Sequence, residues 1–324
     1  IMKIILQLIF ISSFGALLAQ PISVSTTQTP QQLVENVLLG FGVTAFNITI
    51  NGNPALANTP QSNMGYFTNT NALFPIGNGL VLTTGNAIGA PGPNNQGGAT
   101  NNMPATPNVA FDPHLNDIAN AGVTNGIVLE FDFIPYADTV RFKYVFGSEE
   151  YPEFAPPNNS TYNDVFGFFI SGPGITGLQN IAQLPNGGGV VSVNNVNAIT
   201  NSLYYNANGD GTMAPYNTSP NYIQYDGFTD VLEAVSAVQC GQTYHLILAI
   251  ADVGDGSWDS GIFLEANSLS SKTPVDVSSS ISQQVFPNPD WMAEGCVSAT
   301  VTVTRQSNIN SALSIPLSVT GSAT

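Results

Sequence analysis

The chain has 324 residues, of which 43% are hydrophobic and only 8% charged, and its formal net charge is -16. A chain this acidic repels nucleic acids and anionic membranes, so we expect no partner of either class. The apolar content is too high for a disordered acidic tail. Together with the abundance of Gly, Asn, Ser and Thr, it is typical of a secreted, turn-rich β-protein.

Residues 1–19 have the layout of a secretory signal peptide, because Lys3 precedes an apolar run that ends at the small residue Ala19. A membrane-spanning helix is the alternative interpretation. Gln7 and two serines interrupt the run, however, and it is short for a bilayer. We therefore expect export, cleavage near Ala19 and no membrane span in the mature chain.

One short helix and then a series of strands follow. Pro30 at an N1-like position, apolar residues along 33–38 and a stop at Gly40 predict the helix. The strand candidates are short apolar runs bracketed by turn residues, and several alternate with period two. They are residues 79–85, 126–135, 139–147, 165–174, 189–196 and 243–251.

These elements predict an all-β fold, a jelly-roll-like antiparallel β-sandwich that occupies residues 20–270 and carries one short N-terminal helix. Residues 89–108 have no periodicity and are expected to form a long surface loop.

The composition changes after residue 270. Residues 271–288 are expected to link the sandwich to a second module, because they contain few apolar residues. Residues 289–324 then provide an alternating strand at 297–303 and a second strand near the end. Two strands cannot form a stable domain. We therefore expect a truncated β-module, with further domains of the same polypeptide beyond residue 324.

The chain has two cysteines, Cys240 and Cys296, and two histidines, His114 and His245. A disulfide between the cysteines is possible in an exported protein, but two separate thiols, or a pairing beyond the sequence, remain alternatives. We expect His114 in a loop and His245 in a structural role within a buried strand. Aromatic residues at strand spacing, such as those at 166–169, are expected in the core rather than as platforms for sugars.

An unusual charge imbalance lies between residues 144 and 271, which hold twelve aspartates and glutamates and no Lys or Arg. The acids form three local clusters next to predicted strands. The first contains Glu149, Glu150 and Glu153, the second contains Asp164, and the third contains Asp252, Asp255 and Asp259.

Clustered carboxylates repel one another unless a cation lies between them, and Ca²⁺ takes six to eight oxygen ligands. The Asp252 loop lacks the spacing of an EF-hand, so ligands must come from separate loops. The alternative is a set of ordinary Asp-Gly and Asn-Asp turns with solvated glutamates. We expect Ca²⁺ rather than zinc or copper, because imidazole and thiolate ligands are scarce. The candidate metal ligands are Glu149, Glu150, Asp164, Asp252, Asp255 and Asp259.

The chain also resembles a known family, the choice-of-anchor L domain of secreted and surface proteins of Bacteroidetes-type bacteria. The resemblance rests on "LVENVLLGFGV", "GLVLTTG", "VLEFDFIP", "FKYVFGSEEYPEF", "NDVFGFFISGPG", "NIAQLP", "VNNVN", "YDGFT" and "TYHLILAIADVGDGSWDSGIFLEANS", which follow one another in order from residue 33 to 268. One departure is Gly126, which stands where the family pattern leads us to expect Asp.

The resemblance implies a β-rich extracellular module of long multidomain proteins that use type IX secretion. The sequence after residue 294 is similar to the start of a Calx-beta or immunoglobulin-like repeat. The family supplies neither a substrate nor catalytic residues.

Three functions follow from these observations. The leading hypothesis is a non-enzymatic, calcium-stabilised module for adhesion or ligand display at the cell surface, with an extracellular protein or glycan as partner. A glycan-binding module is the first alternative. A secreted hydrolase with two catalytic carboxylates is the second, but Glu149 and Glu150 are adjacent, and neighbouring side chains on a strand point to opposite faces.

Overall fold

A computed structural model of the chain describes residues 22–100, 113–119, 122–158, 161–209, 223–271, 275–284, 286 and 298–305. The predicted signal peptide, Cys296 and the strand expected near the end of the chain lie outside these residues. Cys240 is exposed. Among the described residues, no helix has the length and the apolar character needed to span a bilayer.

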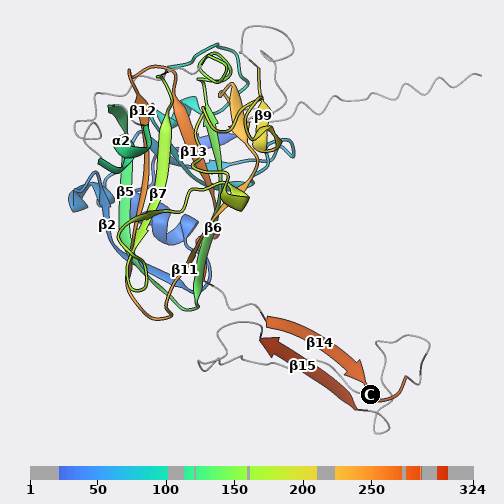
Figure 1. The fold of residues 1–324 in the computed structure, drawn as a ribbon. Helices are drawn as coiled ribbons and strands as arrows, with labels where there is room; N and C mark the ends of the chain where they lie inside the picture. Colours follow the sequence, from blue (N-terminus) through green and yellow to red (C-terminus); the bar gives the residue numbers. More distant parts are fainter. Residues whose placement is uncertain are drawn as a thin grey trace, which may run out of the picture.

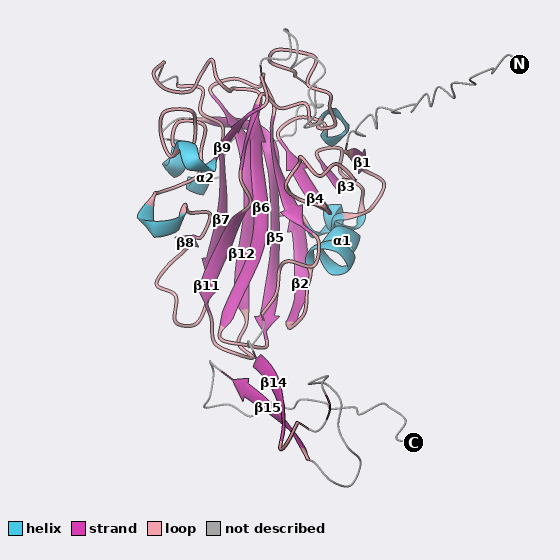
Figure 2. Ribbon diagram, turned by 90° about the vertical axis from the view of Figure 1, so that its right-hand side faces the viewer, coloured by secondary structure: helices cyan, strands magenta, loops and turns pink. Residues whose placement is uncertain are grey.

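Two antiparallel sheets form a sandwich (Figures 1 and 2). The larger sheet has the strand order β1-β3-β4-β13-β6-β10-β9, and β11 pairs with β6 beside this path. Its strands are β1 (Ser23–Ser25), β3 (Met64–Thr68), β4 (Asn78–Thr83), β13 (Ser260–Glu265), β6 (Thr139–Ser148), β10 (Gly227–Thr229), β9 (Tyr205–Ala207) and β11 (Leu232–Ala237).

The smaller sheet has the order β2-β5-β12-β7-β8. Its strands are β2 (Val43–Ile50), β5 (Val123–Pro135), β12 (Tyr244–Val253), β7 (Val165–Ser171) and β8 (Gln179–Asn180). The predicted all-β antiparallel sandwich is therefore confirmed.

Two short helices accompany the sheets. The first, α1 (Pro30–Leu33), starts with a capping box in which Thr29 and Gln32 satisfy each other's backbone N–H groups, and it continues as a π-helical turn over Val34–Leu38. The second, α2 (Pro113–Ala119), was not expected, and it carries His114, which we had placed in a loop. Short 3₁₀ turns occupy Pro54–Asn58, Ala87–Gly89, Pro185–Gly187 and Ser202–Tyr204.

The core between the sheets combines aliphatic side chains with several large aromatic ones. Tyr144 of β6 and Phe168 of β7 are fully buried, with ring centroids 4.9 Å apart and planes at 90°. Each fully buried aromatic of this kind contributes about 1.5–3 kcal/mol through removal of apolar surface from water. Phe166 and Phe169 are buried as well, so the expectation that these aromatics belong to the core is confirmed.

The strand predicted at 189–196 does not form. Only isolated bridges occur there, between Val165 and Ser192 and between Gln183 and Val190. The reason is local, because the side-chain amide of Asn195 donates hydrogen bonds to the carbonyls of Gly188 and Val190. Asparagine side chains that bond to nearby backbone in this way compete with the ladder of a sheet.

A separate strand pair follows the sandwich. In it β14 (Val275–Ile281) pairs with β15 (Ala299–Arg305). The first of these strands lies in the segment that we expected to be a linker, and the second overlaps the strand predicted at 297–303.

Candidate functional site

The acidic side chains from distant parts of the sequence meet at one end of the sandwich. At this end Ser148, the last residue of β6, pairs with Ser260 at the start of β13 and with Gly227 at the start of β10. In the other sheet, Ala251 near the end of β12 pairs with Val165 at the start of β7. The strand ends therefore bring together six buried carboxylates, those of Glu149, Glu150, Asp164, Asp226, Asp252 and Asp259.

Asp164 holds the two sheets together at this end. Its Oδ1 accepts a hydrogen bond from the backbone N–H of Val253 at 3.0 Å, and its Oδ2 accepts one from the Ser260 hydroxyl at 2.7 Å. Its own backbone N–H donates to Oε2 of Glu150 at 3.0 Å. Burial raises the pKa of Asp164 to about 7. Burial, followed by the neighbouring charge of Asp164, raises the pKa of Glu150 to about 10.

Glu149 is completely buried, and neither of its carboxylate oxygens accepts a hydrogen bond. Its backbone N–H donates to the carbonyl of Asp259 at 3.0 Å, which fixes the residue at the start of β13. Burial, then the charge of Asp226, raises the pKa of Glu149 to about 10. The backbone of Ala99 and the amide of Gln224 partly offset this shift, although neither has the geometry of a hydrogen bond to the carboxylate.

Asp252 is in the same situation. It is 1% exposed, and neither carboxylate oxygen accepts a hydrogen bond. Its position follows from a bulge, because the pairing of β12 with β5 shifts register between Ala251 and Asp252. Bulges of this kind re-aim side chains near functional sites. Burial and then the charge of Asp164 raise the pKa of Asp252 well above its usual range.

Gly126 pairs with Ala251 beside this bulge and has a φ of 146°. A side chain at Gly126 would collide with the backbone of Ile250. At this position, where the family pattern led us to expect Asp, the backbones of β5 and β12 therefore lie too close together for a side chain.

Asp259 lies against Gly85, where any Cβ atom would overlap its carboxylate. Asp226 was absent from our candidates. Its Oδ1 accepts a hydrogen bond of 2.6 Å from the amide of Asn94, and Asn94 in turn accepts one from Gln224. The prediction missed Asp226 because it searched for acids that are clustered in sequence, whereas Asp226 reaches the site through strand β10.

Asp255 does not join the buried group. It is exposed, and its Oδ1 accepts a hydrogen bond from the backbone of Ser257 at 2.9 Å, as in an ordinary turn. Its charge still raises the pKa of Glu150, as the smallest contribution. Glu153 is also exposed.

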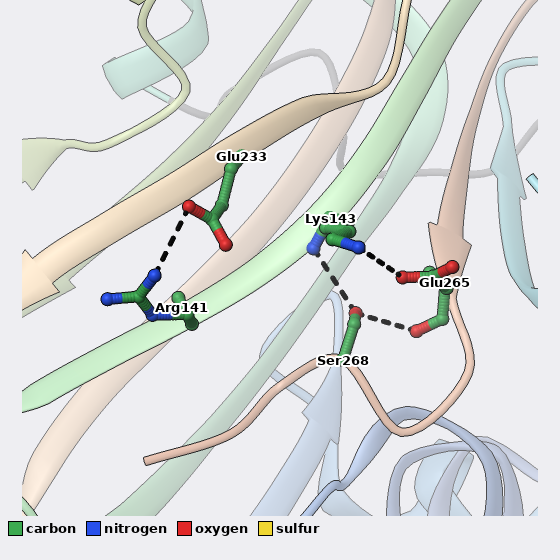
Figure 3. A network of polar contacts seen from close by, with 5 residues as sticks. All are labelled: Arg141, Lys143, Glu233, Glu265 and Ser268. Atoms are coloured by element: carbon green, nitrogen blue, oxygen red, sulfur yellow. Dashed lines mark hydrogen bonds and ion pairs between the residues drawn. The ribbon is translucent and has the colours of Figure 1, made fainter. Parts of the chain in front are cut away.

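The nearest basic residues in sequence neutralise other acids. Arg141 and Lys143, near the opposite end of β6, form ion pairs of 3.5 Å with Glu233 and Glu265 (Figure 3). All four side chains are at least one third exposed. These two cations therefore do not neutralise the buried carboxylates.

His245 lies away from the acidic end, on the outer face of the smaller sheet. Its Nδ1 is 2.9 Å from Asp132 and its Nε2 is 3.4 Å from Glu130. The contact with Glu130 is the main reason why its pKa is raised. This agrees with a structural role for the histidine.

The described part of the chain contains no group of three or more acidic, histidine or cysteine side chains that could hold a metal ion as it stands. Burial instead raises the pKa values of Glu149 and Glu150 far above neutral pH, to about 10 in each case. With such pKa values, these two carboxyl groups keep their protons at neutral pH.

Comparison with known proteins gives one match. The sequence model of the choice-of-anchor L domain family matches residues 22–270, which include both sheets of the sandwich and all six buried carboxylates. No curated protein and no solved structure matches the chain. Because the match covers most of its length, the chain belongs to the choice-of-anchor L domain family.

Proposed function

We propose that this chain is a calcium-stabilised β-sandwich module of a surface-associated protein, which serves adhesion or ligand display rather than catalysis. The family supports the surface-associated part of this proposal. The calcium part rests on the acidic end of the sandwich and on one observation in particular.

That observation is the pair of buried, unpartnered carboxylates of Glu149 and Asp252, with all four oxygens lacking a hydrogen bond. Burying a polar group without a partner costs about 1–3 kcal/mol, and more if the group is charged. A buried polar group without a hydrogen-bond partner in a natural protein needs an explanation, and a bound ion that contacts its oxygens is one. Ca²⁺ is suited to this role, because it binds carboxylate and backbone oxygens in a flexible geometry at about 2.3–2.6 Å.

The cation would join parts of the chain that are far apart in sequence. Glu149 follows β6, Asp252 lies at the end of β12 and Asp259 precedes β13, so an ion bound by them would link the two sheets. Asp226, before β10, would add a fourth carboxylate. A cation that binds the folded chain but not the unfolded chain would raise the free energy of unfolding.

Catalysis is disfavoured by burial. Glu150 and Asp164 have raised pKa values, which suit a general acid. They are only 2% and 0% exposed, however, so a polymeric substrate would not reach them.

The test is thermal unfolding of the chelated protein with and without calcium. If the affinity is that of other extracellular modules, a Kd of about 0.1–1 mM, 10 mM Ca²⁺ should raise the melting temperature by about 5 °C. The same concentration of Mg²⁺ serves as the control and should have a smaller effect, because Mg²⁺ demands a stricter geometry. An unchanged melting temperature in calcium would refute the calcium half of the proposal.

A further inference from the structure

A cavity of about 310 Å³ lies where helix α1, strand β2 and the turn Pro54–Asn58 meet. Its volume is in the range of small-ligand pockets, which starts at about 300 Å³. No carboxylate of the acidic end contributes to it. The residues that line it are Gln31, Glu35, Ala45, Phe46, Asn47, Ile48, Pro54, Ala57 and Asn58.

A bulge in β2 shapes one wall of this cavity. The pairing of β2 with β5 shifts register between Phe46 and Thr49, and Asn47 within the bulge has a φ of 54°. Phe46, Asn47 and Ile48 all line the cavity. A regular strand would place alternate residues on opposite faces, so the bulge is what brings consecutive side chains to the same cavity.

The polar residues of the cavity are held in defined orientations. The amide of Asn47 donates a hydrogen bond of 2.8 Å to Asp132, whose other oxygen contacts His245. The amide of Gln31 donates one of 3.0 Å to Glu35. Because their NH₂ groups donate to these acceptors, Asn47 and Gln31 contribute their side-chain oxygens as further acceptors among the lining residues, to which Glu35 adds a carboxylate.

Phe46 is half-buried, and it adds an apolar surface next to these polar groups. An aromatic ring beside amides and a carboxylate matches the chemistry of a pyranose, which has apolar C–H faces and several hydroxyl groups that donate and accept. The charges of Glu35 and of the nearby Asp132 disfavour an anionic ligand.

We propose that this cavity binds a neutral pyranose unit of an extracellular glycan. The proposal names a ligand for the ligand-display half of the proposed function and rests on that half, whereas it is independent of calcium.

The experiment has two steps, and both are carried out in chelator so that calcium plays no part. Neutral glycans are first screened on an array, and the strongest is then titrated calorimetrically into the wild type, Phe46→Ala and Asn58→Ala. We expect both variants to lose roughly tenfold or more in affinity. Phe41→Ala is the matched control, because Phe41 is 76% exposed and does not line the cavity. It should bind like the wild type.

Two outcomes would overturn the proposal. One is an array without binding above background by protein that shows its normal melting transition. The other is equal affinity of the wild type, Phe46→Ala and Asn58→Ala, which would place any glycan elsewhere. Because Asn58 is exposed, its variant should fold even if Phe46→Ala does not. A negative array together with calcium stabilisation would refute this inference and leave the calcium site standing.

Discussion

The charged side chains at the two ends of strand β6 lie in opposite environments. Near its start, Arg141 and Lys143 are half-exposed and form ion pairs with acids of the neighbouring strands β11 and β13. Just after its end, Glu149 and Glu150 are buried among other carboxylates. The ten-residue strand β6 thus connects a neutral, solvated surface to a buried group of like charges.

This difference shows that exposure, and not charge count, decides what a carboxylate does in this fold. An exposed ion pair gains little, because water screens it and two long side chains lose freedom. A buried carboxylate without a partner is expensive and must be protonated or bound by a cation. We therefore expect substitutions at the buried end to have large, calcium-dependent effects and substitutions at the exposed end to have small ones.

The largest effect is expected for Asp252→Asn. Loss of this ligand should remove most of the calcium-dependent rise in melting temperature, a change of about 5 °C. In chelator the variant should be as stable as the wild type or more stable, because it replaces a buried acid by a neutral isostere. The measurement is thermal unfolding in both conditions. Asp255→Asn is the matched control, since Asp255 is exposed and should keep the full calcium effect. Equal calcium responses of wild type and Asp252→Asn would contradict the proposed ligand set.

The second effect concerns pH and calcium together. Because a ligand must be deprotonated to bind a cation, and the pKa of Glu149 is raised to about 10 and that of Asp252 well above its usual range, calcium affinity should rise as pH rises from 6 to 8. Calorimetry in buffers of different ionisation enthalpy should detect proton release on binding. Binding that is independent of pH, with no proton released, would mean that these carboxyl groups are not ligands.

The chelated protein should show the opposite dependence on pH. A carboxyl group whose pKa is raised on folding keeps its proton in the native state while the unfolded chain releases it. Stability should therefore fall as pH rises from the ordinary value of 4.5 for Glu149 toward its raised value of about 10. Unfolding by denaturant at several pH values measures this slope, and Glu149→Gln should make it shallower. An unchanged slope in Glu149→Gln would contradict the raised pKa of this carboxyl group.

A smaller effect is expected at His245, whose pKa is raised by Glu130 and Asp132. Its contribution to stability should be fully present below the ordinary pKa of 6.5 and should disappear as pH rises through the folded value. Because the side chain is partly exposed, we expect no more than about 1 kcal/mol. His245→Gln should remove this part of the pH dependence in denaturant unfolding. A variant with the same pH profile as the wild type would show that the imidazole contributes nothing in its charged form.

The smallest effect is expected for Glu233→Gln at the exposed end. Removing its pair with Arg141 should cost less than about 1 kcal/mol, and added salt should reduce the difference further. Denaturant unfolding at low and high salt measures it. A cost of several kcal/mol would show that exposure does not separate the two ends as we suggest.

The sequence allowed much of the sandwich to be predicted, because strands β5, β6, β7 and β12 are apolar runs with clear turn residues at their ends. The strand expected at 189–196 does not form because the Asn195 side chain bonds to the backbone of its own loop, a competition that periodicity does not detect. Helix α2 was missed because a helix of only seven residues carries little periodic signal.

The candidate site was predictable only in part. Five of the six candidate ligands predicted from the sequence are buried together, since they adjoin strands that end on the same side. Asp255 and Asp226 show the limit of reasoning from local clusters. The first lies within a cluster but faces solvent in a turn, and the second is remote in sequence but adjacent through the pairing of β10 with β6. Strand pairing over 81 residues, from Gly147 to Phe228, cannot be read from spacing along the chain.

The most direct test of the central claim is calorimetric titration of calcium into the chelated protein at neutral pH, with Asp252→Asn measured in parallel. The account predicts saturable binding with a Kd of about 1 mM or below for the wild type, and at least tenfold weaker binding for the variant. Absence of heat and of saturation in the folded wild type would contradict this prediction. The buried carboxyl groups would then be neutralised by protonation alone.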